Sequence, residues 1–581
     1  MRILLLTPPL TQLNTPYPAT AYLKGLFDAQ GHTTQQADLG IEVADRVLSA
    51  DFLRAVGLEE QARLIEPVKR FLRGQDDTLA PRIANRSLLP EGERFSQLDS
   101  DHLEWSFGVA GTTDKAYHLA TLFIEDIADH IRKHIDPHFD LVRYAEHLSN
   151  DAPIFDPLYD ELQRPPSVVD NIMLQLLAER VESFRPERVC ITIPFPGCLY
   201  GALRCGQWLL QHTEATVELG GGFPNTEWRS MAAPGQPAMI GEPRLREFCH
   251  EVLIDGHPEA DQYCPSFEGL PLDKYLSLTE MTNPMHRLWS QGRWNKMVMA
   301  HGCYWHRCAF CDTSLDYIGN FRQPKASVVV DHMERVMEQT QRTGFHFVDE
   351  ALPPRLIGEV AEEVLRRGLA LSFWGNIRFE KAYTADLCDL LAEAGMVAVS
   401  GGLEVASDRL LKLIDKGVSV RQTVDACRHL RDAGIMVHTY LMYGFPTETL
   451  QESVNALETV RRMFDEGIVQ SAFWHRYAMT CHSPSGLHPE RYGARRINKE
   501  PNPFCNNEVD WTTIENGKLK TENYPGADAN SQFSTLNSQF DYDIEAVGAA
   551  LRLATYNYMN GLGLDQPVRS WFPIKVPKPT I

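Results

Sequence analysis

The regular alternation of short apolar segments with helical ones over residues 296–477 constrains the fold most strongly. The segments predicted to be buried strands are 297–300, 345–348, 369–374, 396–400, 435–442 and 468–474. Between them, apolar residues recur at helical spacing, as at Met333, Val336 and Met337. Strands that alternate with helices form parallel sheets. Six repeats are two short of an eightfold barrel, so we expect an open, partial (β/α)6 barrel of the TIM type over residues 285–480.

Glycines mark the ends of the helical segments in this region. Five segments are followed by a glycine before the next strand: Gly344, Gly368, Gly395, Gly434 and Gly467. Glycine at that place is typical of a helix that stops in the left-handed conformation. We therefore expect a positive φ angle at each of them.

A second, interrupted alternation occupies the N-terminal part. In order, it predicts a strand at 3–6, a helix at 20–30, a strand ending near Ala37, a helix at 174–184, a strand at 189–193, a helix at 199–211 and strands at 216–219 and 252–254. This α/β order predicts a doubly wound, Rossmann-like domain formed by residues 1–40 and 166–275. Residues 41–165 are charged and helical in period, which predicts a helical insertion. Residues 481–581 are predicted to form a C-terminal cap, irregular at first and helical over 543–560.

The net charge and the start of the chain exclude some classes of protein. The formal net charge is −21, from 77 acidic and 56 basic residues. Such a field repels phosphate backbones, so we expect no nucleic-acid partner. No apolar run approaches the roughly 18 residues of a membrane span. The opening MRILLLTPPL fits a buried strand better than a signal peptide. We therefore expect a cytoplasmic protein without a membrane partner.

Three of the twelve cysteines are clustered, directly after the first predicted barrel strand. Cys303, Cys308 and Cys311 lie within nine residues. Thiolates are the preferred ligands of iron–sulfur clusters, and functional groups of such barrels lie on the loops at the carboxyl ends of the strands. Three ligands on a four-iron cluster leave one iron open to another molecule. The alternatives are a structural zinc site completed by His301 or His306, or three buried thiols.

This loop resembles that of the radical S-adenosylmethionine (SAM) superfamily, in which an aromatic residue precedes the last cysteine. Phe310 takes that place. Four residues separate Cys303 from Cys308 where three are usual, so the loop differs in shape. The resemblance covers roughly residues 290–480, and it implies a 4Fe-4S cluster and SAM as cofactors.

Other residues at predicted strand ends match the superfamily in order along the chain. The resemblance implies that they contact SAM: Asp349, Glu350, Asn376, Arg378, Gly402, Glu404, Gly444 and Glu448. Each taken alone is equally typical of a helix cap or a turn. Tyr477 and Cys481 follow the sixth strand and are candidates to donate a proton or a hydrogen atom, although a solvated barrel rim explains this region as well.

A doubly wound domain before a radical barrel resembles the cobalamin-binding branch of the same superfamily. The residues implied to contact cobalamin are Thr7, Pro8, Thr192, Phe195, Gly197, Gly220, Gly221, Gly222 and Phe223. Glycines at strand ends let a large ligand approach the backbone. Any parallel α/β domain is the alternative. The chain lacks the Asp-x-His-x-x-Gly motif that supplies a histidine to cobalt, so the lower cobalt ligand is not identified.

The resemblance implies a cobalamin-dependent radical SAM enzyme. We expect it to transfer a methyl group to an unactivated carbon of a small molecule or peptide, with electrons from a flavodoxin- or ferredoxin-type protein. One alternative keeps the cofactors but ends in cyclisation, rearrangement or oxidation. Another is a non-catalytic iron–sulfur or corrinoid-binding protein. Nothing in the insertion or the cap identifies the substrate.

Overall fold

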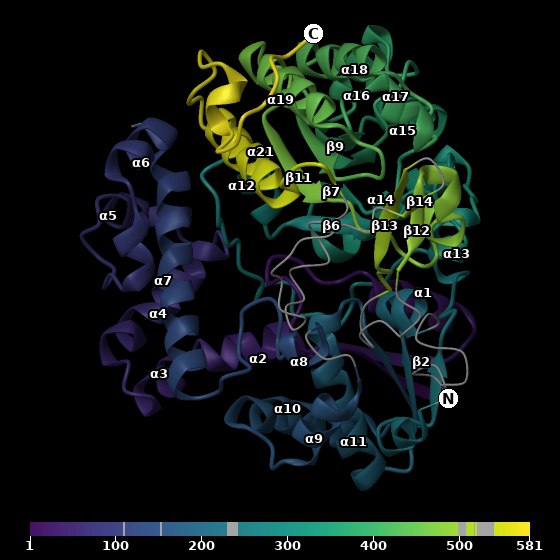
Figure 1. The fold of residues 1–581 in the computed structure, drawn as a ribbon. Coiled ribbons are helices and arrows are strands. Elements are labelled where there is room, and N and C mark those ends of the chain that lie inside the picture. Colours follow the sequence, from purple (N-terminus) through teal and green to yellow (C-terminus); the bar gives the residue numbers. More distant parts are fainter. Residues whose placement is uncertain (109–110, 151–153, 229–241, 498–506, 516–517, 520–539) are drawn as a thin grey trace. The chain divides into compact units, whose positions relative to one another are not determined.

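The computed structural model describes the chain except residues 109–110, 151–153, 229–241, 498–506, 516–517 and 520–539. It divides into two compact units (Figure 1). The first unit contains Met1–Met297 and Asp331–Gly344. The second contains Val298–Val330, Phe345–Glu500 and Asn507–Ile581. The units are described separately below.

The first unit is built on a five-stranded sheet in the order β2-β1-β3-β4-β5. Its strands are β1 (Arg2–Thr7), β2 (Thr33–Asp38), β3 (Arg188–Thr192), β4 (Thr216–Gly220) and β5 (Glu251–Leu253). All neighbouring pairs are parallel. The main helices between these strands are α1 (Ala19–Ala29), α10 (Val168–Phe184) and α11 (Leu199–His212). The predicted doubly wound arrangement is therefore confirmed, with the apolar side chains of β1 fully buried at its centre.

Helices occupy most of the segment between β2 and α10, as its periodicity predicts. They are α2 (Leu39–Val47), α3 (Ala50–Ala55), α4 (Glu59–Leu72), α5 (Ala80–Ala84), α6 (Ser100–Phe107), α7 (Thr112–His134), α8 (His147–Asn150) and α9 (Asp156–Gln163). Helix α7 is the longest, and α4 to α6 pack against it (Figure 1). The rings of Phe71 and Tyr117 lie 4.6 Å apart between α4 and α7.

The barrel region contains a six-stranded sheet in the order β11-β10-β9-β8-β7-β6. Its strands are β6 (Trp294–Met297), β7 (Gly344–Phe347), β8 (Ser372–Ile377), β9 (Met396–Glu404), β10 (Met436–Tyr443) and β11 (Ser471–Arg476). The helices between successive strands are α13 (Asp316–Gly319), α14 (Ala326–Thr340), α15 (Pro354–Arg367), α16 (Ala385–Glu393), α17 (Asp408–Leu413), α18 (Val420–Asp432) and α19 (Leu450–Asp465). Strands that follow chain order and alternate with helices are the arrangement of an open (β/α)6 barrel, as predicted.

Several strand bounds and one glycine in this region differ from the prediction. Strand β6 ends at Met297 instead of beginning there, and β8 and β11 begin at Ser372 and Ser471 instead of residues 369 and 468. The fifth glycine also differs: φ is positive at four of the predicted positions, but Gly344 is the first residue of β7. A β-carbon on Gly344 would lie 2.8 Å from the ring of Trp294. Close packing against a neighbouring strand, and not a helix stop, therefore requires glycine at this position.

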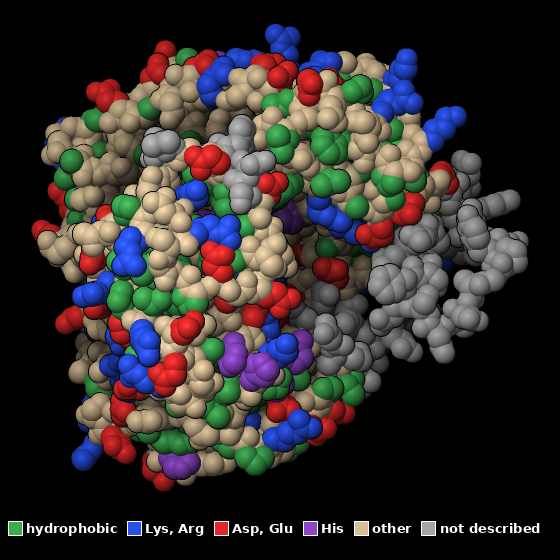
Figure 2. Space-filling view, turned by 90° about the vertical axis from the view of Figure 1, so that its left-hand side faces the viewer, with side chains coloured by type: hydrophobic (Ala, Val, Ile, Leu, Met, Phe, Trp, Pro, Cys, Tyr) green, Lys and Arg blue, Asp and Glu red, His purple; other side chains and the backbone are tan. Residues whose placement is uncertain are grey.

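The C-terminal part adds a small sheet that sequence periodicity did not predict. Its strands are β12 (Ala494–Arg496), β13 (Trp511–Glu515) and β14 (Lys518–Leu519), paired antiparallel. Helix α21 (Ile544–Met559) corresponds to the helix predicted over 543–560. The Asp543 carboxylate caps its N-terminus, and the helix packs against β11 and α19. None of the described helices is both long and apolar enough to cross a membrane. On the face shown in Figure 2, acidic and basic side chains are interspersed.

Candidate active site

A cavity of about 310 Å³ lies in the second unit, among residues at and beyond the carboxyl ends of β7 to β10. All three clustered cysteines line it. So do six of the other predicted site residues: Phe310, Glu350, Asn376, Arg378, Gly402 and Glu404. Residues from separate strand ends and from the cysteine loop thus meet at one place, because the strands are parallel and end at the same edge.

Backbone contacts determine the course of the cysteine loop. Gly302 has a φ of +72°, and a β-carbon there would lie 2.7 Å from the carbonyl oxygen of Asn320. The next residue, Cys303, donates its N–H to the carbonyl of Ile318 at 3.0 Å. Further along, Ala309 donates to the carbonyl of Ile414 at 2.9 Å. The loop is therefore anchored on both sides of Cys308.

Two cations lie beside the thiols. The Nη1 atom of Arg378 is 3.8 Å from the Sγ atom of Cys308. Lys416 forms a buried ion pair with Glu404 at 2.6 Å, and its Nζ atom lies 5.5 Å from the centre of the Phe310 ring. The pKa of the Cys308 thiol is lowered, first by a hydrogen bond from Cys311 and then by the charges of Lys416 and Arg378. The site thus favours a thiolate at Cys308.

The two histidines considered as zinc ligands have other partners. The Nε2 atom of His301 lies 2.8 Å from a carboxylate oxygen of Asp316. The Nδ1 atom of His306 lies 2.8 Å from the carbonyl oxygen of Cys303, although His306 also lines the cavity. Within the described residues, no three ligating side chains surround one point as a single metal ion would require.

Asp349 and Glu350 follow β7 but differ in position. Asp349 is 2% exposed, and its carboxylate accepts hydrogen bonds from the N–H groups of Met299 and Ala300 at 2.8 and 2.6 Å. Burial raises the pKa of Asp349 to about 7. These bonds also explain why β6 ends early, since they turn the backbone after Met297 towards Asp349. Of the two acids, only Glu350 lines the cavity.

The glycine turn after β10 is organised by Glu448. Its carboxylate accepts hydrogen bonds from the N–H groups of Gly444 and Phe445 and from the Ser453 hydroxyl, at 2.6, 3.3 and 2.7 Å. Gly444 has a φ of +81°. Burial raises the pKa of Glu448 to about 7. Neither Gly444 nor Glu448 lines the cavity, so the structure places them in the frame around it.

Tyr477 and Cys481 lie behind the cysteine loop, outside the cavity lining. Tyr477 is 5% exposed, and its hydroxyl donates to the Ser485 hydroxyl at 2.8 Å. Ser485 in turn donates to the carbonyl of Ala309 at 2.6 Å. The N–H of Cys481 bonds to the carbonyl of Asn507 at 2.9 Å. In this arrangement Tyr477 supports the loop that carries the cysteines and does not face the space beside them.

Sequence reasoning missed three polar side chains of the cavity: Ser400, Lys416 and Tyr440. Lys416 belongs to the segment LLKLIDKG, which follows the fourth barrel strand and also resembles the superfamily. Tyr440 is 36% exposed although it lies within strand β10. The polar and aromatic residues His438, Thr439 and Tyr440 in the middle of this barrel strand were the signal that could have found it.

The residues predicted to bind cobalamin gather at one edge of the first unit's sheet, but most are covered. Buried members are Thr7, Pro8, Thr192, Gly197 and Phe223. Phe195, by contrast, is 55% exposed, and Gly222 is exposed beside it in this edge. The buried hydroxyl of Thr192 has no hydrogen-bond partner among the described residues. A ligand at this edge would therefore contact Phe195 and Gly222 directly.

The three glycines at the end of β4 allow two backbone segments to cross closely. Gly221 has a φ of +114°, and a β-carbon there would lie 2.7 Å from the carbonyl oxygen of Ile193. The N–H groups of Ile193 and Phe223 bond to the carbonyls of Gly220 and Ile193 at 2.7 and 3.0 Å. Gly221 is therefore needed for the close crossing of two chain segments, whether or not a ligand binds.

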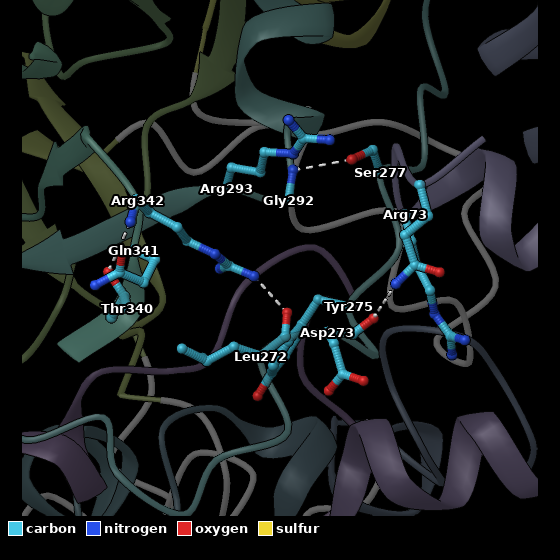
Figure 3. A pocket seen from close by; sticks show the side chains of 11 residues that line it. Arg73, Leu272, Asp273, Tyr275, Ser277, Gly292, Arg293, Thr340, Gln341 and Arg342 are labelled. Atoms are coloured by element: carbon cyan, nitrogen blue, oxygen red, sulfur yellow. Dashed lines mark hydrogen bonds between the residues drawn. The ribbon is translucent and has the colours of Figure 1, made fainter. Parts of the chain in front are cut away.

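A second cavity, of about 290 Å³, lies elsewhere in the first unit (Figure 3). Arginines contribute to its wall, but each is engaged. Arg73 pairs with Asp45 at 2.6 Å, and Arg293 donates to a backbone carbonyl at 2.6 Å. Figure 3 shows Arg342 reaching across the cavity to the carbonyl of Leu272. No predicted site residue lines this cavity.

Comparisons with known proteins match the part of the chain that contains the cysteine cavity. Residues 297–460 match the Radical SAM superfamily. An uncharacterized methyltransferase of Pyrococcus horikoshii is 22% identical over 201 residues, which are 34% of this chain and 41% of that protein. The anaerobic magnesium-protoporphyrin IX monomethyl ester cyclase of Rubrivivax gelatinosus is 28% identical over 227 residues, 38% of this chain and 37% of the cyclase. The chain thus spans about two fifths of the length of these relatives.

Solved structures with a similar course of the chain include two described as cobalamin-dependent or cobalamin-bound. The radical SAM methyltransferase TsrM from Kitasatospora setae, with cobalamin and a [4Fe-4S] cluster bound, has a TM-score of 0.46 at 13% identity, covering 98% of this chain and 99% of TsrM. The cobalamin-dependent SAM radical enzyme OxsB has a TM-score of 0.43 at 13% identity, covering 59% and 58%. The superfamily match spans all three cysteines and the whole cavity lining, and we conclude that the barrel of this chain is a radical SAM domain.

Proposed function

We propose that the chain is a radical SAM enzyme that holds a 4Fe-4S cluster through Cys303, Cys308 and Cys311. The observation that carries the proposal is that these three thiols line a single cavity together with two cations. Positive charge beside the thiols offsets the negative charge that three thiolates bring into a partly buried site. When bound, the cluster would supply the electron that cleaves SAM.

The remaining cavity residues suit the polar groups of SAM. Glu350 and Glu404 present carboxylates that can accept hydrogen bonds from an ammonium or from hydroxyls, and Asn376 offers both a donor and an acceptor. Lys416 holds the Glu404 carboxylate in place. Gly402 lacks a side chain, which lets the Glu404 carboxylate and Lys416 pack against the end of β9, since a β-carbon there would lie 1.8 Å from a Glu404 oxygen.

We propose further that the first unit binds cobalamin at the edge formed by the ends of β1, β3 and β4. Support comes from the exposed ring of Phe195, the open backbone at Gly222 and the hydroxyl of Thr192, which has no hydrogen-bond partner in the described part of the chain. Ligands of doubly wound sheets bind beyond the carboxyl ends of the strands. The buried residues Thr7, Pro8, Gly197 and Phe223 would shape this edge from beneath.

For the reaction we propose methyl transfer to an unactivated carbon of a small molecule or peptide, with a flavodoxin- or ferredoxin-type reductant in the cytoplasm. The relative named as a methyltransferase supports this reading. The second candidate is a radical reaction without net methylation, such as cyclisation, and the similarity to the ester cyclase favours it.

The test is anaerobic reconstitution of the whole chain with iron, sulfide and cobalamin. We expect about four irons and four sulfides per chain, a cobalamin absorption spectrum, and 5′-deoxyadenosine from SAM after reduction. S-adenosylhomocysteine in addition supports methyl transfer, whereas deoxyadenosine alone supports the second candidate. A preparation that binds zinc, or iron without sulfide, contradicts the proposal.

A further inference from the structure

One of the residues that line the cavity, Arg378, contacts the sulfur atom of a clustered cysteine. Arg378 follows β8 and is 4% exposed. Its Nη1 atom is 3.8 Å from the sulfur of Cys308, and its Nη2 atom donates to the carbonyl of Lys416 at 2.5 Å. One arm of the guanidinium is thus directed at a cluster ligand while the other is fixed to the backbone.

The guanidinium is also held by the cysteine loop. The ring centre of Trp305 lies 4.6 Å from the guanidinium carbon, and that of Tyr304 lies 5.8 Å away. Trp305 is itself fixed, because its indole N–H donates to the carbonyl of Asp415 at 2.7 Å. A β-carbon on Gly417 would lie 2.2 Å from the Trp305 ring, so the indole packs on bare backbone. Both aromatic residues lie in the lengthened interval between Cys303 and Cys308.

The charge of Arg378 is less compensated than that of its neighbour Lys416. Lys416 has a carboxylate oxygen of Glu404 at 2.6 Å, so this pair is nearly neutral at a distance. The acid near Arg378 is Glu380, whose oxygen is 3.6 Å from Nε, and Nε makes no hydrogen bond to a described residue. Arginine stays protonated at any relevant pH, so this positive charge is permanent.

A permanent positive charge and an N–H donor next to a cluster sulfur have a definite redox effect. Reduction of the oxidised cluster, [4Fe-4S]²⁺ + e⁻ → [4Fe-4S]⁺, adds one negative charge, and the electron comes from the external reductant. Hydrogen bonds to the ligating sulfur atoms and nearby net charge set the potential of such clusters. A cation at Cys308 stabilises the reduced state more than the oxidised state. It therefore makes reduction easier within a chain whose net charge is −21.

Resting on the proposed cluster site, we propose that Arg378, clamped by Trp305 against Cys308, raises the reduction potential of the cluster. This role differs from a contact with SAM, because it acts whether or not SAM is bound. The proposal also assigns a role to the lengthened loop, because its residues Trp305 and Tyr304 hold the guanidinium in place.

The experiment is a potentiometric titration of the reconstituted chain without SAM, followed by electron paramagnetic resonance of the reduced cluster. We expect Arg378→Gln to make reduction at least tenfold less favourable, which corresponds to a midpoint potential about 59 mV more negative. Arg378→Lys keeps the charge and should shift the potential less. Arg307→Gln is the matched control. Arg307 stacks on the same Trp305 at 4.9 Å but is exposed and pairs with Asp415, so no shift is expected.

Each outcome bears on the inference. An unchanged SAM-free potential in Arg378→Gln, with iron and sulfide retained, overturns it, even if SAM affinity falls. If Arg378→Gln retains no cluster, Trp305→Leu is measured instead, and it should shift the potential in the same direction by a smaller amount. No shift in Trp305→Leu with its cluster present overturns the clamp. A wild-type chain without a 4Fe-4S cluster would instead contradict the proposed function itself.

Discussion

The carboxyl ends of the five-stranded and the six-stranded parallel sheets differ in what surrounds them. In the barrel, side chains from successive strand ends and from the cysteine loop surround a cavity. At the edge of the five-stranded sheet, the equivalent loops pack on one another, as Gly221 does on Ile193. A barrel curves its strand ends around a shared space, whereas an open sheet leaves them in a row that the chain itself can cover. Residues after strands are therefore better candidates for ligand contact in the barrel.

The largest effect that tests this difference is expected at the cysteines. Cys308→Ala should abolish formation of deoxyadenosine and lower iron content well below four per chain, because a ligand is lost from the centre of the cavity. Cys264→Ala is the control, since Cys264 is only half-buried and lies outside the cavity. Iron and sulfide analysis with product chromatography measures both. Equal iron in the two variants would contradict the ligand assignment.

Two phenylalanines at the sheet edge distinguish residues that stabilise the fold from residues that bind cobalamin. Phe223 is 3% exposed and lies 6.0 Å from Trp228, so Phe223→Ala should cost about 3–5 kcal/mol of stability. Phe195 is 55% exposed, so Phe195→Ala should leave stability nearly unchanged and weaken cobalamin binding. Denaturant unfolding followed by tryptophan fluorescence, and cobalamin titration by absorbance, make the comparison. If Phe195→Ala has no effect on cobalamin affinity, the proposed edge is wrong.

Glu448 offers a pH test of the frame around the barrel cavity. Its folded pKa of about 7 is above the usual 4.5, so the folded state holds a proton that the unfolded state releases. Stability should therefore fall between about pH 4.5 and pH 7 and level off above, by up to about 3 kcal/mol at 1.36 kcal/mol per pKa unit. Glu448→Gln removes this titration.

The control for this experiment is a surface acid. The difference in unfolding free energy between Glu448→Gln and wild type should become more favourable to the variant as the pH rises through this window. The exposed Glu490→Gln should show no such trend. A difference that does not change with pH would mean that Glu448 ionises normally in the folded chain.

The smallest effect is expected at Tyr477. Tyr477→Phe removes the hydroxyl that bonds to Ser485, a loss of about 1 kcal/mol. Because Ser485 holds the cysteine loop through Ala309, the variant should lose its cluster faster in the presence of a chelator. It should keep its product pattern once reconstituted. A changed ratio of products with normal cluster retention would instead restore Tyr477 as a group that faces substrate.

Much of the site was predictable because residues at successive predicted strand ends match the superfamily in the same order along the chain. All eight residues so assigned to SAM were expected at strand ends, and five of them line the cavity: Glu350, Asn376, Arg378, Gly402 and Glu404. Only the structure shows that the carboxylate of Asp349 caps the backbone after β6 and that Asp349 lies outside the cavity lining. Residue order cannot tell an acid that faces a cavity from its neighbour that faces away.

By itself, the sequence determined the features that depend on neighbouring residues. These are the alternation of strands and helices, the four positive-φ glycines at helix ends, and the cluster of three thiols in one loop. Only the tertiary structure decided which side chains meet across long intervals. Arg378 reaches Cys308 over 70 residues, and Ser485 reaches Ala309 over 176. Such contacts depend on where each strand ends and which way its last side chains point, and a period along the chain carries no information about either.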